Sequence, residues 1–443
     1  MKEKEFKKYP KYKPSDIEWI GEIPEEWEFK KTKYCFNYTT GFTPPTGQSE
    51  YYNGDHIWIT ISDMNQKYLS DSSTKLSDKA IEKYKPDVTP KGSLLFSFKL
   101  SVGKVAFAGT DVYTNEAIIS IIPNENVNLD YYFYILPDQL LRNANENIYG
   151  AKLLNQELIK NASIIFPPPA EQTAIANYLA DKTAKIDTLI EKKKKLIELL
   201  KEERTAVINQ AVTKGINPNV KLKPSGIEWL GEIPEHWEVK KLKYVAKVQS
   251  SNVDKKTIEG EVPILLCNYV DVYKNEFIDD SFNFMEATAT AKEIGKFILH
   301  EGDVLITKDS ETPDDIANPA YVKQDFNNVI CGYHLAQIKP NKSQLLGEFL
   351  FRLFQSKKFN SHFEVSANGV TRFGLPLDSI TDVKVSFPKL DEQIQIVQYI
   401  ETETKRIDGT ISKIEKEIEL LAEYRTALIS EVVTGKIDVR NMV

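Results

Sequence analysis

Residues 387–437 read FPKLDEQIQIVQYIETETKRIDGTISKIEKEIELLAEYRTALISEVVTGKI, and they repeat an earlier stretch of the same chain. That stretch, residues 166–216, reads FPPPAEQTAIANYLADKTAKIDTLIEKKKKLIELLKEERTAVINQAVTKGI, and 24 of the 51 aligned positions are identical. Apolar residues recur at intervals of seven, which is typical of the seam of a coiled coil. The pattern therefore predicts two long helices, each with one apolar stripe. The seam positions are Ile400, Ile407, Ile414, Leu421 and Leu428 in the later copy and Leu179, Ile186, Lys193, Leu200 and Val207 in the earlier copy, with Ile175, Leu189, Leu196, Ile396, Ile411 and Ile418 beside them.

Proline and glycine set the expected limits of these helices. Pro167–Pro169 and Pro388 prevent an earlier start, and Gly215 and Gly435 are suitable C-terminal stops. About 40 helical residues would form a rod of roughly 60 Å.

The two helical stretches differ in charge. Residues 171–204 hold 8 basic and 7 acidic residues, whereas residues 392–425 hold 5 basic and 8 acidic residues. The opposite signs of these excesses favour pairing of the two helices with each other over pairing of each with its own copy in a second chain. Two helices that each lie on their own domain are the alternative.

A second repeat marks where the other parts of the chain begin. Residues 17–34 and 227–244 are identical at 14 of 18 positions, in the pattern IEWxGEIPExWExKKxKY. The sequence therefore predicts four segments: block 1 (1–165), helical segment 1 (166–216), block 2 (217–386) and helical segment 2 (387–443). Because Trp19, Trp27, Trp229 and Trp237 belong to the repeat, we expect them to pack where each block meets a helix rather than to contact a ligand.

The blocks are alike at their edges and differ in the middle. Short β-branched runs bounded by turns predict strands in a mixed α/β fold. These runs are 56–62, 93–98, 104–109 and 117–123 in block 1 and 262–267, 303–308 and 334–340 in block 2, and residues 346–359 have helical spacing.

Composition narrows the class of protein. With 41% hydrophobic and 27% charged residues, and no apolar run of the ~18 residues that a membrane span needs, the sequence is that of a globular protein outside the membrane. The first residues, MKEKEFKKYPKYKP, have no apolar stretch, so we do not expect a secretory signal. The three separated cysteines, Cys35, Cys267 and Cys331, fit a reducing cytoplasm and buried apolar positions. The net charge of −7 argues against tight DNA binding by the chain alone.

Signatures of catalysis are missing from the sequence. It has no phosphate-binding loop, no H-E-x-x-H and no nucleophile elbow. Asn318–Tyr321, NPAY, is similar to the N-P-P-Y loop of amino-methyltransferases, but Ala320 replaces the second proline. We therefore expect an ordinary turn at Pro319. A metal-nuclease interpretation of Asp303 and Lys308 rests only on charged residues at strand ends.

Taken in order, the segments resemble the specificity (S) subunit of type I restriction–modification systems over essentially the whole chain. The matching stretches are TTGFTPPTGQSEYYNGDHIWITISDMN (39–65), KGSLLFSFKLSVGKVAFAG (91–109), GDVLITKD (302–309) and GVTRFGLPLDSITDVKVSFPKLDEQ (369–393). Each stretch alone is weak evidence for the family, whereas their order and their duplication are specific to it.

The resemblance implies an α+β fold of two α/β target recognition domains separated by two long helices, which pair as an antiparallel coiled coil in a circular, pseudo-two-fold repeat. It implies that each block reads half of a bipartite, asymmetric site in double-stranded DNA and that the helices set the spacer. It also implies a cytoplasmic, non-catalytic chain without its own cofactor. Methyltransferase (M) subunits, two of them, would bring S-adenosylmethionine, and restriction (R) subunits would bring ATP and Mg.

Candidate DNA contacts follow from the groups that recognise bases. Arg and Lys donate to guanine, Asn and Gln pair with adenine, and such groups act from loops that enter the major groove. In block 1 the candidates are Thr43, Gln48, Tyr51, Lys99, Ser101, Lys104, Lys152 and Asn155, and in block 2 they are Asn252, Asn268, Tyr269, Lys308, Asp309, Ser310, Thr371, Arg372 and Phe373. Lys99 aligns with Asp309, so we expect the blocks to prefer different sequences.

Three alternatives remain open. The chain could serve a bifunctional methyltransferase–nuclease, it could be a coiled-coil scaffold without a DNA role, or it could be a self-sufficient methyltransferase that uses NPAY. The target sequence and the spacer length do not follow from the residues.

Overall fold

The computed structural model describes residues 7–15, 17–99, 101–146 and 152–442. The chain forms two compact units, one of residues 1–192 with 417–443 and the other of residues 193–416. Each unit thus contains one block and one end of each helical segment. The division of the sequence into two blocks and two helical segments remains a prediction about which parts have separate functions. Among the described residues, we find no helix with the length and apolar character to cross a bilayer.

Two long helices dominate the secondary structure. They are α5 (Pro169–Lys214) and α11 (Leu390–Val433). Proline at the first position of α5 is favourable because its missing N–H would have no partner in the helix. Gly215 (φ 74°) and Gly435 (φ 76°) follow the helices in the left-handed conformation that ends them. The predicted limits are confirmed.

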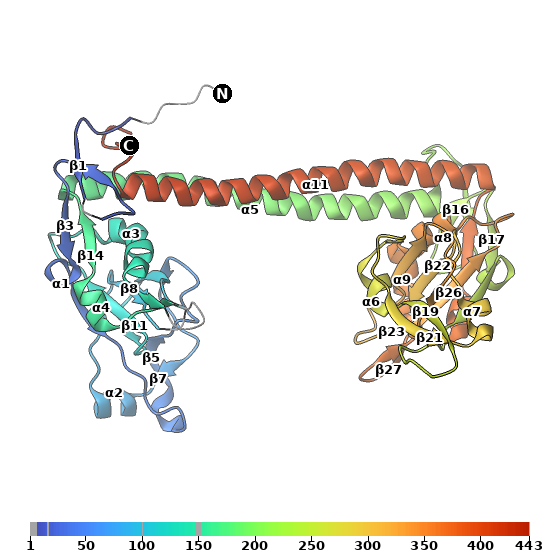
Figure 1. Ribbon diagram of the computed structural model, residues 1–443, viewed down its shortest axis with the longest axis horizontal. Helices are drawn as coiled ribbons and strands as arrows, with labels where there is room; N and C mark the ends of the chain where they lie inside the picture. Colours follow the sequence, from blue (N-terminus) through green and yellow to red (C-terminus); the bar gives the residue numbers. More distant parts are fainter. Residues whose placement is uncertain (1–6, 16, 100, 147–151, 443) are drawn as a thin grey trace. The chain divides into compact units, whose positions relative to one another are not determined.

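The two helices pair with each other in antiparallel directions (Figure 1). In unit 1 the start of α5 packs on the end of α11, where Arg425 Nε lies 2.8 Å from Asp187 Oδ1. In unit 2 the end of α5 packs on the start of α11, where Arg204 Nε lies 3.0 Å from Asp408 Oδ1. Because Asp187 and Arg204 sit 221 positions before Asp408 and Arg425, the two ion pairs are equivalent in the repeat.

The apolar seam recurs at alternating steps of three and four residues. Leu179, Ile186, Leu200, Ile400, Ile407, Ile414 and Leu428 are buried, as predicted, and Leu421 is partly buried. Towards the end of α5 the seam moves by one position, because Ile208 is buried while Val207 is half-buried. The expectation for Leu189 and Leu196 was wrong. Both are 42% exposed, whereas the residues that directly follow them, Ile190 and Ile197, are partly buried.

Unit 1 is built on a five-stranded sheet of order β4-β11-β8-β9-β6 and a three-stranded sheet of order β10-β5-β7. Its strands are β1 (Tyr12–Pro14), β2 (Glu22–Pro24), β3 (Glu28–Lys31), β4 (Asn37–Thr40), β5 (Tyr52–Ile59), β6 (Tyr68–Leu69), β7 (Lys75–Leu76), β8 (Leu94–Ser97), β9 (Val105–Ala108), β10 (Tyr113–Thr114), β11 (Ile118–Ile122), β12 (Asn145–Glu146), β13 (Lys152–Leu153) and β14 (Ser163–Phe166). Its shorter helices are α1 (Thr32–Cys35), η1 (Ser49–Tyr51), α2 (Asp78–Tyr84), α3 (Leu129–Arg142) and α4 (Gln156–Asn161).

Unit 2 has a five-stranded sheet of order β18-β26-β22-β24-β20 and three-stranded sheets of order β21-β19-β25 and β23-β28-β27. Its strands are β15 (Leu222–Pro224), β16 (Glu232–Pro234), β17 (Glu238–Lys241), β18 (Ala246–Ser250), β19 (Val262–Cys267), β20 (Phe277–Ile278), β21 (Met285–Ala289), β22 (Val304–Thr307), β23 (Asp309–Ser310), β24 (Pro319–Val322), β25 (Val329–Cys331), β26 (Leu335–Pro340), β27 (Asn368–Gly369), β28 (Phe373–Gly374) and β29 (Lys384–Phe387). Its shorter helices are η2 (Leu242–Tyr244), α6 (Tyr269–Lys274), α7 (Ala291–Phe297), α8 (Gly347–Phe354), α9 (Lys357–Ser366) and α10 (Leu377–Thr381).

The two five-stranded sheets share one topology. In each, the strands fall in the same chain order and the central pairs are antiparallel, with Leu94 opposite Phe107 in unit 1 and Val304 opposite Tyr321 in unit 2. The duplication seen at the edges of the blocks therefore extends through their middles, and every predicted strand is present. The turn expected at Pro319 was wrong, since Pro319 begins β24, which suits a residue without an N–H at the first position of a strand.

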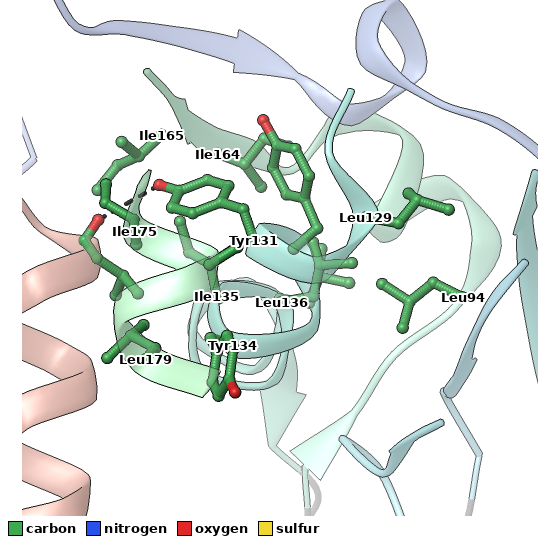
Figure 2. Close-up of a cluster of buried hydrophobic side chains, with 14 of the residues drawn as sticks. Leu94, Leu129, Tyr131, Tyr134, Ile135, Leu136, Ile164, Ile165, Ile175 and Leu179 are labelled. Atoms are coloured by element: carbon green, nitrogen blue, oxygen red, sulfur yellow. Dashed lines mark hydrogen bonds between the residues drawn. The ribbon is translucent and has the colours of Figure 1, made fainter. Parts of the chain in front are cut away.

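Each block rests on the helices through one short helix. In unit 1, Figure 2 shows Tyr131, Tyr134 and Ile135 of α3 against Ile175 and Leu179 of α5. In unit 2, Phe349, Leu350 and Leu353 of α8 share a core with Ile396 and Ile400 of α11. Sequence patterns missed α3, whose Pro137 lies inside the helix.

The seam yields a prediction about stability. Ile407→Ala should lower the free energy of unfolding by about 2–5 kcal/mol, because it leaves a cavity in place of a fully buried side chain. Leu196→Ala, an exposed position on the partner helix, should cost about 0.5 kcal/mol or less. Denaturant unfolding of the two variants measures the difference, and equal losses would contradict the seam described above.

Candidate nucleic-acid interface

The repeated tryptophans anchor each block to the first turn of a long helix. Trp27 Nε1 donates to Glu171 Oε2 at 2.9 Å, and Trp237 Nε1 donates to Glu392 Oε1 at 3.0 Å. Trp27 and Trp237 are buried. For Trp27 and Trp237 the prediction that the repeated tryptophans pack at the junction of block and helix is confirmed, and these two are not available to stack on bases.

The neighbouring glutamines complete the junction. Gln172 accepts from the Asn128 N–H at 3.0 Å, and Gln393 accepts from the Leu346 N–H at 2.9 Å. Both amide groups also donate to the carbonyl of the proline five residues earlier, at 2.9 Å. Because Asn128 and Leu346 directly precede α3 and α8, each glutamine fixes the helix on which its block rests.

Most block 1 candidates occupy separate exposed loops. Lys99, Ser101 and Lys104 are exposed on the turn between β8 and β9, where Gly103 has φ 95°. Lys104 Nζ donates to the Ile61 carbonyl at 3.2 Å. Elsewhere, Thr43 donates to Glu116, and Gln48 is exposed before η1. These candidates thus come from separate loops of block 1.

Two block 1 candidates have structural roles, and a third borders on undescribed residues. Tyr51 was a wrong choice, because it is 1% exposed and packs on Tyr84 with ring centroids 5.4 Å apart. Asn155 caps α4 by accepting from the Leu158 N–H at 2.8 Å. Lys152 is exposed in β13, while the expected loop at 149–155 lies partly outside the described residues.

Five block 2 candidates come together around one cavity of about 490 Å³. They are Tyr269, Asp309, Ser310, Thr371 and Arg372, and Tyr273, Glu311 and Asp315 complete the lining. Tyr269 and Tyr273 stack with ring centroids 5.5 Å apart, and the Tyr273 hydroxyl donates to Asp315 at 2.7 Å. Ser310 is mostly covered.

The other block 2 candidates lie around this cavity or away from it. Lys308 Nζ lies 4.9 Å from the centre of the Tyr333 ring, and Phe373 is half-buried in β28 beside the cavity residues. Asn268 caps α6 through a reciprocal hydrogen-bond pair with Asp271. Asn252 is exposed and donates to Glu293 at 2.7 Å.

His334 is a cavity-side residue that sequence reasoning missed. Its Nδ1 lies 2.6 Å from Asp309 Oδ2, and Arg372 Nη2 lies 3.2 Å from Nδ1 and 3.5 Å from Nε2. The His334 backbone has φ 71°, which is uncommon for a residue other than glycine. Gly332, two residues before, is the only local sign of an unusual turn in CGYH.

An ion network fixes block 2 on the helices. Glu276 accepts from Arg204 of α5 at 2.8 Å and from Arg352 of α8 at 3.2 Å. Burial lowers the pKa of the Arg352 guanidinium, and the charge of Glu276 opposes that effect. In block 1 the equivalent position by strand register is Lys67, whose Nζ lies 3.3 Å from Asp130 of α3. The signs of charge at the two junctions are thus reversed.

Residues considered for chemistry have structural partners. Asp303 is buried, accepts from Gln337 Nε2 at 2.7 Å and has a pKa raised by that burial. Tyr321 of the NPAY stretch is buried against Phe351, so it is not placed to stack on a base. The cysteines are buried and free, and burial raises the pKa of Cys35 to about 11. Within the described ranges, no group of three His, Cys, Asp or Glu side chains is arranged to hold a metal ion.

Comparison with protein families decides how this arrangement is classified. The model of the type I restriction modification DNA specificity domain matches residues 24–199 and again residues 234–420. The chain belongs to this family. It is a type I restriction–modification specificity subunit with two DNA-recognition domains, and each match spans one block and most of the helix that follows it.

Relatives and solved structures agree with this assignment. The specificity subunit of the type I restriction enzyme MjaIX from Methanocaldococcus jannaschii is 27% identical over 455 residues, covering 99% of each chain. That of EcoBI from Escherichia coli is 24% identical over 300 residues, covering 65% of this chain and 61% of that one. The HsdS subunit from Thermoanaerobacter tengcongensis shares the fold with a TM-score of 0.57, at 14% identity, over 94% of this chain and 98% of its own. A chain from a study of complex assembly and conformational transition of the type I R-M system matches with a TM-score of 0.68, at 14% identity, over 93% and 98%.

The ion network of this specificity subunit leads to a prediction about stability. Glu276→Gln should destabilise block 2 by about 1–3 kcal/mol, because it removes the carboxylate to which the buried Arg352 guanidinium donates. Asp130→Asn removes the more exposed partner at the block 1 junction and should cost about 1 kcal/mol or less. Calorimetric melting of both variants tests the difference, and a larger loss for Asp130→Asn would show that the network is not what holds block 2.

Proposed function

We propose that this chain is the non-catalytic subunit that gives a type I methyltransferase–restriction complex its sequence preference. Block 1 reads one half of a bipartite, asymmetric DNA site and block 2 reads the other. The observation that carries the proposal is the matched pair of five-stranded frames, which present different side chains in their loops. Lys99 of block 1 and Asp309 of block 2 occupy aligned positions with opposite charges, so the same sequence would not suit both.

We assign the spacing of the two half-sites to the helices. At about 1.5 Å per residue, the 46 residues of α5 span about 69 Å, which exceeds one turn of B-DNA at roughly 34–36 Å. A paired helix keeps its length, whereas a flexible linker samples many distances. The helices would therefore fix how many unspecified base pairs separate the two halves.

The same helices offer matching apolar surfaces to partner proteins. Leu199 of α5 is 49% exposed, and Leu420, its equivalent 221 positions later in α11, is 51% exposed. Single exposed leucines are common on protein surfaces, but the recurrence of this one at equivalent positions of both helices fits two equivalent partner sites. Because the surface occurs twice, we propose that two M subunits bind, one at each leucine.

The catalytic groups of the complex then belong to other chains. In this proposal the M subunits bind S-adenosylmethionine, the R subunits bind ATP and Mg, and this chain binds no cofactor. The complex would act in the cytoplasm, where its DNA substrate and the reducing conditions suited to three free thiols are found.

The proposed function predicts a specific change in DNA methylation. Deletion of the gene from its source cells should abolish adenine methylation at one split motif, made of two short defined halves around a fixed gap. Replacement of residues 13–165 by the corresponding block of a relative should change one half of that motif and leave the other half and the gap intact. Methylation sequencing of the three strains measures both effects. If no adenine motif depends on the gene or on its blocks, the proposed function is wrong.

The leucine pair predicts the number of bound M subunits. Leu199→Asp or Leu420→Asp should each lower the count from two to one, and the double variant should lose both, because a charge would be buried at the interface. Native mass spectrometry of complexes co-expressed with the M subunit measures the count. Val88→Asp, at a position of block 1 that is also 49% exposed, is the matched control and should keep two. Two bound M subunits in the double variant would rule out this surface.

A further inference from the structure

The cavity of block 2 differs from the rest of the candidate interface in its charge. Among its lining residues, Asp309, Glu311 and Asp315 are acidic and Arg372 is basic. Three carboxylates around one guanidinium repel a DNA phosphate, so an ordinary backbone contact is disfavoured here. The edges of bases carry no net charge and present hydrogen-bond donors and acceptors. The cavity therefore suits a base edge better than the sugar–phosphate backbone.

The Arg372 guanidinium is held in place by His334. The Nδ1 atom of His334 lies 2.6 Å from Asp309 Oδ2, close enough for its hydrogen to be donated to that carboxylate. Arg372 Nη2 is nearly equidistant from both ring nitrogens, at 3.2 and 3.5 Å, so the guanidinium lies against the imidazole ring. The Arg372 side chain is nevertheless exposed. One edge of the guanidinium is thus supported while the side chain remains accessible to a ligand.

His334, which supports the Arg372 guanidinium, has an uncommon backbone conformation. A φ of 71° in a residue with a β-carbon is strained and persists only where neighbouring contacts enforce it. Here the Lys308 N–H donates to the His334 carbonyl at 3.0 Å, and the Leu375 N–H donates to the Lys308 carbonyl at 2.8 Å. These bonds tie the histidine to the strand ends that carry Asp309 and Arg372.

Of the three carboxylates that line the cavity, two accept hydrogen bonds from neighbouring side chains and the third is exposed to solvent. Asp309 accepts from His334, and Asp315 accepts from the Tyr273 hydroxyl at 2.7 Å and from Asn318 Nδ2 at 3.0 Å. Glu311 is exposed at the rim. A carboxylate accepts from the N4 amino group of cytosine, and a guanidinium donates to O6 and N7 of guanine.

We propose that Arg372 and Glu311 read a G·C base pair in the half-site recognised by block 2, with Arg372 donating to guanine and Glu311 accepting from the cytosine amino group. His334 and Asp309 are positioning residues for Arg372. The inference rests on the proposed function and adds to it the base pair that this cavity recognises. It is particular to block 2, because Lys99 and Ala117 occupy the block 1 positions that match Asp309 and His334 by strand register.

The test uses the full chain co-expressed with its M subunits and adenine-methylation sequencing. The half of the motif that changes when block 2 is exchanged should contain a G·C pair. Arg372→Gln should lower methylation of the original site by roughly ten-fold to a hundred-fold and admit A·T at that one position, because glutamine pairs with adenine. Arg372→Lys, which keeps the charge but loses the fork of two donors, should give a smaller loss without the switch to A·T.

His334→Ala provides the readout for a positioning role. It should relax the same single position as Arg372→Gln, and the double variant should be no worse than Arg372→Gln alone. Lys292→Gln, which removes an exposed positive charge from α7 of the same block, is the control and should leave every position unchanged.

The outcomes separate the inference from the function on which it rests. If the wild-type complex methylates no split motif, the proposed function fails and the inference fails with it. If the motif exists but Arg372→Gln changes no position, or weakens all sites uniformly as the loss of a phosphate contact would, the inference alone is overturned. Native mass spectrometry of each variant shows whether both M subunits are retained. A variant that loses them is misfolded, and its loss of methylation is not counted against the inference.

Discussion

The architecture depends on one buried junction that occurs twice. At the start of each long helix, a glutamate accepts from a tryptophan of the block, and the next residue, a glutamine, holds the helix on which the block rests. The glutamines are fully buried, and a buried amide without partners would cost about 1–3 kcal/mol, so the block and the helix must meet in this one arrangement. This requirement explains why EQ and the tryptophan motif recur in both halves of the sequence while the loops between them diverge.

The two units are also equivalent at the point where a long helix leads into the strands of a block. In unit 2, the chain continues from the end of α5 through Gly215 into the strands of block 2. At the corresponding point of unit 1, two segments distant in the sequence meet, and the Asp438 N–H donates to the Lys7 carbonyl at 2.7 Å. Tyr12 further donates to the Gly435 carbonyl at 3.0 Å. Hydrogen bonds thus join two segments of unit 1 whose counterparts in unit 2 are continuous in the chain.

The parts of the structure that the sequence predicts are those determined by local periodicity. Seven-residue spacing, proline and glycine predict α5 and α11, and β-branched runs predict the sheet strands, because each such signal lies within one element. The wrong expectations arose where tertiary packing decides between neighbours. Leu189 and Leu196 are as apolar as Ile190 and Ile197, and only packing against the partner helix determines which of them is more exposed. The sequence around Tyr51 suggests an exposed aromatic residue, because it does not show that α2 packs over this side chain. The roles of His334, Glu276 and Arg352 could not be found, because the contacts that define them join residues 25 to 76 positions apart and depend on the completed fold.

An acidic chain suits a subunit whose task is discrimination. Phosphate contacts supply affinity without regard to sequence, and base contacts supply the preference. A chain with a net charge of −7 gains little from the phosphates of unrelated DNA, which keeps its non-specific binding low. The ratio of specific to non-specific binding, rather than the affinity itself, determines whether a rare site is found among many others. Under the proposed function, partner subunits that contact the backbone would provide affinity for both halves, and the base contacts of each block would decide which DNA is retained.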